Sequence, residues 1–167
     1  MKIKQTALIL LFGALIVGGC KKSDKATPIS AFDKITLTDI KAQEANFKSE
    51  NIDGTTAEGQ VLKNGAIIFY KTNSGNYGKL RVISIAGKNA ENPDLSDLIT
   101  IDMITYKTGE SVINKPKLTI RGTYYCDLDI GVEEGDLQTS DFQWSRQNMT
   151  YIFISPLNGA TFYKYSN

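Results

Sequence analysis

The sequence predicts a single all-β domain, a small antiparallel β-sandwich or barrel of about 8 to 11 short strands. Apolar residues come in short bursts rich in Ile, Val, Tyr, Phe and Thr, the residue types that favour strands. Turn signals separate these bursts, among them NIDG, KNG, NSGNYG, KTGE and PLNGA. At 167 residues the chain is long enough for one hydrophobic core but not for two.

The expected strands follow from these bursts and from the turns between them. They lie at residues 34–37, 44–48, 59–62, 66–71, 79–85, 98–106, 111–113, 117–130, 141–145, 150–154 and 161–165. Asn64-Gly65 and Asn158-Gly159 offer the positive φ of tight turns, so each predicts a hairpin. The stretch TLTDIKAQEANF at 36–47 fits both a helix face and strand alternation, and we favour a strand or loop there. Asn92 and Pro93 either begin a single helical turn or belong to a loop.

The first 19 residues have the three parts of a secretory signal peptide. Lys2 and Lys4 form a basic start, residues 7–17 are an apolar run, and Gly18 and Gly19 directly precede Cys20. As a helix, the apolar run would rise only about 16 Å, which is too short to cross a bilayer core. The segment therefore predicts export rather than a membrane span.

The residues Val17-Gly18-Gly19-Cys20 resemble the lipobox of bacterial lipoproteins. This resemblance covers roughly the first 20 residues and does not extend to the rest of the chain. It implies a signal peptide at 1–19 and a lipidated Cys20. The polar residues after Cys20 lack an apolar period and contain Pro28, so 20–31 are expected to be the lipidated cysteine and a flexible tether, and the strand pattern places the all-β domain at 32–167. The resemblance also implies attachment to a membrane through the lipid on Cys20. Lys21 and Lys22 stand where an Asp would resemble an inner-membrane retention signal, so the outer membrane is favoured.

Composition excludes several classes of function. The chain contains no histidine, which removes Ser-His-Asp and Cys-His relays and histidine metal ligands. Its net charge is +1, and loss of two lysines with the leader makes this −1. Basic and acidic residues are interspersed, so nucleic acid is not an expected partner. No cofactor is predicted.

The longest alternating run, KLTIRGTYYCDLDI at 117–130, separates into an apolar and a polar face. The expected core face consists of Leu118, Ile120, Gly122, Tyr124, Cys126, Leu128 and Ile130. The expected polar face consists of Thr119, Arg121, Thr123, Tyr125, Asp127 and Asp129. With Cys20 taken by lipid, Cys126 has no partner within the chain and is predicted to be a buried free thiol.

The polar face of this run is the predicted ligand-binding site. Its residues Arg121, Tyr125, Asp127 and Asp129 combine a flat aromatic ring with charged groups, as sugar recognition requires. One of Tyr163 and Tyr165 is expected to add a second exposed ring.

The acidic stretch CDLDIGVEEGD suggests two alternatives. Five carboxylates within it could supply the oxygen ligands that calcium prefers, although their spacing departs from an EF-hand loop: Asp127, Asp129, Glu133, Glu134 and Asp136. Asp127 or Asp129, paired with Glu133 or Glu134, could also serve a small carboxylate-dependent glycoside hydrolase.

Taken together, these features predict a lipid-anchored envelope protein with a non-catalytic β-domain that binds a glycan or a protein. The alternatives are the carboxylate-dependent hydrolase and a structural envelope lipoprotein without a small-molecule site.

Overall fold

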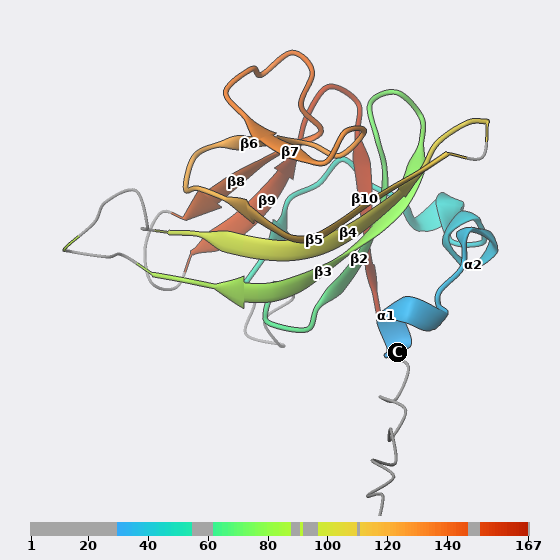
Figure 1. The fold of residues 1–167 in the computed structure, drawn as a ribbon, viewed down its shortest axis with the longest axis horizontal. Helices are drawn as coiled ribbons and strands as arrows, with labels where there is room; N and C mark the ends of the chain where they lie inside the picture. The colour runs from blue at the N-terminus through green and yellow to red at the C-terminus, as the bar shows by residue number, and fades with distance from the viewer. Residues whose placement is uncertain are drawn as a thin grey trace, which may run out of the picture.

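The structure is a computed structural model, and it describes residues 30–54, 62–87, 91, 97–109, 111–146 and 151–166. Within these ranges ten β-strands form two antiparallel sheets of five strands each, which pack against one another (Figure 1). The two sheets remain separate, so of the two expected architectures the sandwich is confirmed.

We call the two sheets A and B. Sheet A has the order β10-β2-β3-β4-β5 and contains β2 (Ile67–Lys71), β3 (Tyr77–Ile85), β4 (Ile99–Tyr106), β5 (Val112–Ile120) and β10 (Thr161–Tyr165). Sheet B has the order β1-β9-β8-β6-β7 and contains β1 (Ile52–Asp53), β6 (Tyr125–Asp127), β7 (Val132–Glu134), β8 (Phe142–Arg146) and β9 (Ile152–Pro156). The expected strands at 66–71, 79–85, 98–106, 141–145, 150–154 and 161–165 are confirmed, with ends that differ by two residues at most.

The main core lies between the two sheets. Every second residue of β4 is buried because successive side chains of a strand point to opposite faces: Ile99, Ile101, Met103 and Thr105. Phe142, Trp144 and Ile154 face them from sheet B. The indole N–H of Trp144 donates to the backbone oxygen of Asp97 at 2.6 Å, so the largest core side chain keeps its polar group satisfied.

Three short helical segments precede β1: α1 (Ala31–Lys34), α2 (Leu37–Lys41) and the 3-10 helix η1 (Glu44–Asn46). Phe32, Ile35 and Ile40 bury their side chains against Ile67 and Phe69, forming a second apolar cluster on the outer face of sheet A. The predicted strands at 34–37 and 44–48 are therefore wrong.

Two capping boxes explain these helices. Ser30 caps α1 and Thr36 caps α2, and each hydroxyl accepts from the backbone N–H of the Asp three residues later. Each Asp side chain in turn accepts from the backbone N–H of its cap residue. The S/T-x-x-D spacing satisfies backbone donors at both helix starts and outweighs the partial alternation.

The expected long strand at 117–130 is also wrong, because the chain turns twice within it. β5 ends at Ile120, Thr123 has a φ of +67°, and the three-residue β6 follows in the other sheet. A second turn after Asp127 leaves Ile130 48% exposed, although alternation placed it in the core. Cys126 is fully buried and free, as predicted.

Both Asn-Gly pairs form tight turns, but neither turn joins two paired strands. Asn158 and Gly159 have φ values of +52° and +88° in a turn from β9 of sheet B to β10 of sheet A. Gly65 has a φ of +84°, and its turn precedes β2, which pairs with β3 and β10. The local conformation was predictable, whereas the identity of the paired strands was not.

Ser30 caps α1 and Ala31 is its first residue, so the last two residues of the expected tether belong to the domain. The signal peptide, Cys20, the rest of the tether, residues 59–61, Asn92 and Pro93 lie outside the described residues. Among the helices that the structure describes, none is long and apolar enough to cross a membrane. Figure 1 shows α1 beside the C-terminal end of the chain at the lower edge, while the β2–β3 turn lies at the upper edge.

Candidate binding site

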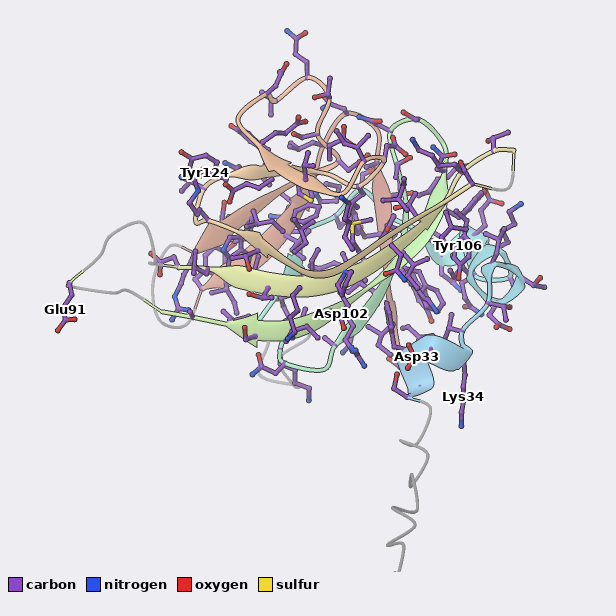
Figure 2. All side chains as sticks on the ribbon, viewed as in Figure 1. Asp33, Lys34, Glu91, Asp102, Tyr106 and Tyr124 are labelled. Atoms are coloured by element: carbon purple, nitrogen blue, oxygen red, sulfur yellow. The ribbon has the colours of Figure 1, made fainter. Side chains whose placement is uncertain are left out.

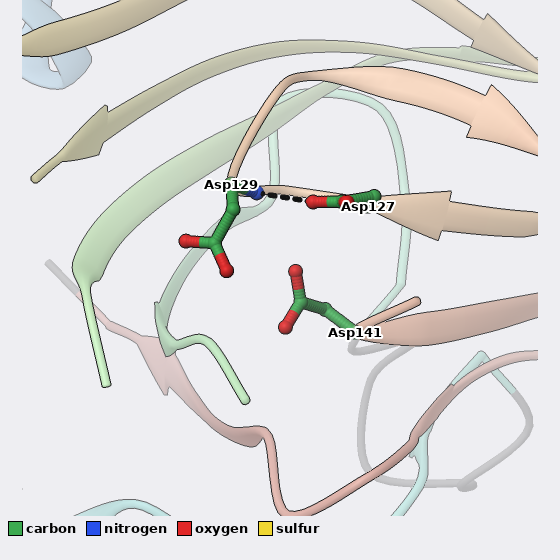
Figure 3. Close-up of side chains that lie close together, drawn as sticks. All are labelled: Asp127, Asp129 and Asp141. Carbon is green, nitrogen blue, oxygen red and sulfur yellow. Dashed lines mark hydrogen bonds between the residues drawn. The ribbon is translucent and has the colours of Figure 1, made fainter. Parts of the chain in front are cut away.

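Three aspartates converge where turns of the two sheets meet (Figure 3). Asp127 ends β6, Asp129 lies in the turn that follows, and Asp141 directly precedes β8. One carboxylate oxygen from each lies within 4.8 Å of the other two. We call these three residues the aspartate cluster.

Hydrogen bonds to the cluster hold several turns together. Asp141 accepts from the backbone N–H groups of Asn73 and Leu128, both at 2.7 Å. Asp129 accepts from the Thr72 hydroxyl at 2.9 Å and from the Asn76 amide at 2.8 Å. The cluster thus ties the β2–β3 turn of sheet A to sheet B.

Asp127 closes its own turn, because its Oδ1 accepts from the backbone N–H groups of Asp129 and Ile130. A carboxylate that bonds backbone two residues ahead is a common turn device. All three aspartates therefore have a structural role in fixing the turns.

Burial raises the pKa of two members of the cluster, Asp141 and Asp127. It raises the pKa of Asp141 from 3.8 to about 7, against the lowering effect of the hydrogen bonds from Asn73 and Leu128, and the nearby charges of Asp129 and Asp127 raise it further. The carboxyl of Asp141 consequently gains or loses its proton near neutral pH.

The five predicted calcium ligands do not meet at one point. Asp127 and Asp129 join Asp141, which the sequence reasoning had placed in a strand. Glu133 pairs with Arg121 at 2.7 Å, and Glu134 accepts from the hydroxyl groups of Thr139 and Ser140. Asp136 accepts from the backbone N–H of Gln138.

The aspartate cluster offers oxygen atoms of the type that calcium prefers. However, both oxygens of the fully buried Asp141 already accept backbone N–H groups. The observed hydrogen bonds give the cluster a structural role, which is to hold neighbouring turns together.

The four predicted ligand-binding residues do not share one exposed face. Asp127 and Asp129 are buried, with 8% and 9% exposure, which corrects the expectation that they point to solvent. Arg121 lies over the ring of Tyr124 at 4.0 Å from its centroid and pairs with Glu133, while Tyr125 is half-buried in β6. The aromatic partner of the arginine is therefore Tyr124 and not Tyr125.

A different part of the molecule offers a concave surface. A hollow of about 340 Å³ lies between α2, the β2–β3 turn and the β4–β5 turn. It is lined by Leu37, Lys41, Gly75, Asn76, Tyr77, Tyr106, Lys107, Thr108, Gly109, Ser111 and Val112. Tyr106 lies beside α2 (Figure 2). We call this the tyrosine hollow.

Two half-buried tyrosines form the aromatic part of the hollow, Tyr77 at the start of β3 and Tyr106 at the end of β4. The ammonium groups of Lys41 and Lys71 lie 5.4 and 5.1 Å from the Tyr77 ring centroid. The Tyr77 hydroxyl donates to Glu44, which fixes the ring in place. Burial raises the pKa of Tyr106, so its hydroxyl stays protonated at neutral pH.

Asn76 connects the tyrosine hollow to the aspartate cluster. Its side-chain nitrogen donates to Asp129, and its side-chain oxygen accepts from the backbone N–H of Thr108 at 3.1 Å. One wall of the hollow is thus held by the cluster. The wall is prearranged, which lowers the cost of ordering it around a ligand.

The hollow was not predicted from the sequence, because the predicted exposed rings, Tyr125 and one of Tyr163 and Tyr165, all lie in the C-terminal third of the chain. Tyr77 lies within the predicted turn NSGNYG, and Tyr106 directly precedes the predicted turn KTGE. A tyrosine beside a turn at the end of each of two neighbouring strands was the sequence feature that could have indicated the hollow.

Two further hollows are less suited to a defined ligand. One of about 420 Å³ follows β10 and mixes Lys48 and Lys164 with Glu50 and Asp53. The other, of about 400 Å³, lies between α1, α2 and Tyr165.

Comparison with known proteins gave no matching family model, no matching curated protein and no matching solved structure.

Proposed function

We propose that this protein is a lipid-anchored cell-envelope protein whose β-sandwich is a non-catalytic binding module. The tyrosine hollow is the binding site. The observation that carries the proposal is the hollow itself. Two tyrosines line this concave surface, and hydrogen bonds from Asn76 to Asp129 and from Thr108 to Asn76 hold one of its walls in place.

The anchor follows from the resemblance of the leader to lipoprotein signal peptides. After cleavage, lipid on Cys20 would hold the chain on the membrane, favoured as the outer membrane by Lys21 and Lys22. Residues 21–29 could span up to about 30 Å before the first described residue.

The aspartate cluster does not favour a hydrolase as a second function. A catalytic acid must reach its substrate, but Asp127 and Asp129 are buried. Of their expected partners, Glu133 is paired with Arg121, and Glu134 accepts from Thr139 and Ser140.

Lipid attachment is tested by expressing the full-length chain and its Cys20→Ser variant in a bacterium fed an alkyne-labelled fatty acid. We expect the wild type to carry the label and to sediment with membranes, and the variant to do neither. Equal labelling of both proteins would overturn the lipid anchor.

Ligand binding is tested with the full-length protein in a polyoxyethylene detergent, which contains no sugar. Glycans are screened by the shift in melting temperature, because a ligand that binds only the folded state raises it. We expect Ser111→Trp to abolish any saturable shift by filling the hollow, and Tyr106→Ala to weaken it.

Tyr125→Ala is the matched control, since Tyr125 is a half-buried tyrosine on the other sheet. A shift that is lost in Tyr125→Ala and retained in Ser111→Trp would move the site to the face that the sequence predicted. Binding that none of the three variants changes would overturn the assignment to the hollow.

A further inference from the structure

We propose that the aspartate cluster is a proton-controlled latch, which holds the β2–β3 turn of sheet A against sheet B and loosens this turn when Asp141 loses its proton. The latch itself does not depend on what the protein binds. Its effect on ligand binding rests on the proposed function, because residues of the same turn line the tyrosine hollow.

The β2–β3 turn gives the cluster three hydrogen-bond donors. The backbone N–H of Asn73 donates to Asp141 at 2.7 Å. The Thr72 hydroxyl and the Asn76 side-chain amide donate to Asp129 at 2.9 and 2.8 Å. All three bonds end on a carboxylate that belongs to the sheet B side of the contact. The charge of the cluster therefore acts directly on the contact between the two sheets.

The turn can move away from the cluster without losing its own shape. Within the turn, the backbone N–H of Thr72 donates to the carbonyl oxygen of Asn76, and the N–H of Gly75 donates to the carbonyl oxygen of Thr72. The side chain of Asn73 also donates to the backbone oxygen of Thr139, and this contact with the sheet B side does not involve a charged group. The carboxylate contacts are thus the part of the attachment that responds to pH.

Asp141 is the member of the cluster whose charge changes near neutral pH. Burial, with a smaller contribution from the charges of Asp129 and Asp127, raises its pKa from 3.8 to about 7, against the lowering effect of the backbone N–H groups of Asn73 and Leu128. One carboxylate oxygen of each aspartate lies within 4.8 Å of the other two (Figure 3). Loss of the Asp141 proton therefore adds a like charge to a buried cluster, and this favours any movement that lets water reach it.

Other ionisable groups face the cluster from the elements packed around it: Tyr70 on β2, Cys126 on β6, and Glu133 and Glu134 on β7. Burial raises the pKa of the tyrosine and of the cysteine well above their ordinary values, so both stay neutral near pH 7. Of the two glutamates, one is paired with Arg121 at 2.7 Å, and the other raises the pKa of Asp127 through its negative charge. These neighbours act in the same direction as the cluster or leave its charge unchanged.

The sign and size of the effect follow from the two environments of the Asp141 carboxyl. Its pKa is about 7 in the closed latch, against 3.8 for a carboxyl in water. The closed state therefore binds the proton more tightly, and a rise in pH favours opening. The equilibrium constant for opening should increase by roughly fiftyfold from about pH 5 to about pH 7 and level off above about pH 8.

Opening of the turn reaches the tyrosine hollow through Asn76. Its side chain donates to Asp129 and accepts from the backbone N–H of Thr108 in the β4–β5 turn, so a displaced β2–β3 turn disturbs one wall of the hollow. Under the proposed function, a ligand that needs this wall binds more tightly at about pH 5 than at about pH 8. By linkage, such a ligand also raises the pKa of Asp141.

The test requires no ligand. The full-length protein, labelled with ¹⁵N and held in detergent, is titrated by NMR from about pH 5 to about pH 8.5, and the protection of single amides is calculated against unstructured peptide at each pH. We expect the amides of Asn73 and Leu128 to shift with a midpoint near pH 7. Protection of the Asn73 and Asn76 amides should fall by roughly fiftyfold between about pH 5 and about pH 7, and the Thr108 amide should shift with the same midpoint.

Two variants and a control assign the effect to the cluster. Asp141→Asn removes the titrating group and should make the protection independent of pH. Asp129→Asn keeps a side-chain oxygen for Thr72 but removes a neighbouring charge, so the midpoint should fall, and this variant decides the test if Asp141→Asn does not fold. Asp136→Asn is the matched control, because this exposed aspartate accepts from the backbone N–H of Gln138 outside the cluster and should behave as the wild type.

The contrary outcomes are distinct. Amides of Asn73 and Leu128 that do not titrate in this range would refute a proton-controlled latch. Titrating amides with constant protection would also refute it, because the carboxyl would then ionise without releasing the turn. An unaltered Thr108 amide beside a loosened turn would refute the link to the hollow alone. A failed glycan screen, in contrast, would refute the proposed function and leave the latch in place.

Discussion

The side-chain nitrogen of Asn76 lies 2.8 Å from Oδ1 of Asp129, and this hydrogen bond joins a turn of sheet A to a turn of sheet B. The same side chain accepts from the backbone N–H of Thr108 in the β4–β5 turn. One amide thereby links three turns that are far apart in the sequence. The β2–β3 turn, the β4–β5 turn and the turn after β6 are therefore held together by hydrogen bonds. The wall of the tyrosine hollow belongs to this set of linked turns.

Replacing Asn76 by alanine should destabilise the domain and loosen this wall. The variant loses two side-chain hydrogen bonds, one of them to the buried carboxylate of Asp129, so we expect a loss of about 1–3 kcal/mol in the free energy of unfolding. Urea unfolding can be followed through the fluorescence of Trp144, the single tryptophan. Asn46→Ala is the control, because the exposed side chain of Asn46 donates to Gln43, three residues earlier on the surface. Equal losses in both variants would contradict the linking role.

Asp141 should make the stability of the protein fall as the pH rises. Its pKa is raised from 3.8 to about 7 in the folded state, mainly by burial, so the folded protein holds a proton that the unfolded chain has released. Asp141 contributes its full stabilisation of the folded state below about pH 4, and this contribution is lost progressively up to about pH 7. The total loss in the free energy of unfolding is on the order of 4 kcal/mol.

Other acids titrate in the same range, so the measurement compares the wild type with Asp141→Asn. We expect the difference between their unfolding free energies to change with pH between about 4 and about 7 and to be constant above about 8. A difference that is constant over the whole range would show that Asp141 has an ordinary pKa.

Local sequence features predicted local structure well and the pairing of distant segments poorly. The strand at Thr161–Tyr165 was predicted to the residue, because its apolar burst follows a clear Asn-Gly turn. The same turn led to a wrong hairpin, since a turn's φ values do not determine which sheet receives the next strand. The helices α1 and α2 differ from the expected strand or loop because two capping boxes satisfy backbone donors at their starts, and this outweighs the partial alternation of apolar residues.

The candidate site was harder to predict for a related reason. The sequence reasoning grouped carboxylates that are close in the chain, but Asp141 joins Asp127 and Asp129 only because β8 pairs with β6. Likewise, Tyr77 and Tyr106 become neighbours through the register of β3 against β4, where they are directly opposite each other. Both contacts depend on strand pairing, which the hydrophobic pattern did not specify.

Gly78 is required by close packing inside the sandwich. A Cβ at this position would lie 2.2 Å from Cζ of Tyr70, a fully buried ring whose hydroxyl is hydrogen-bonded to Thr105 at 2.7 Å. Because Tyr70 cannot move without disturbing the core, we expect Gly78→Ala to cost about 3 kcal/mol or more in urea unfolding. Gly135→Ala is the control: its Cβ would meet nothing within 4 Å, and we expect a change within about 0.5 kcal/mol. A mild Gly78→Ala variant would show that the Tyr70 ring has room to shift.

Lys79 holds the first helix of the domain against the sheet. Its ammonium group is buried and donates to the backbone oxygens of Phe32 at 2.5 Å and Ile35 at 2.7 Å. Burial lowers the pKa of Lys79, against the raising effect of the charges of Asp33 and Asp39.

Lys79→Met should therefore release α1 before it affects the rest of the sandwich. Methionine fills similar space but leaves both carbonyl oxygens without a donor, at a cost of about 1–3 kcal/mol. We expect faster hydrogen exchange in a peptide that covers residues 30–41, with little change in β4 or β8. Lys34→Met changes an exposed lysine of the same helix and should leave exchange unaltered. Unchanged exchange in Lys79→Met would mean that the apolar contacts of Phe32, Ile35 and Ile40 hold the segment without the ammonium group.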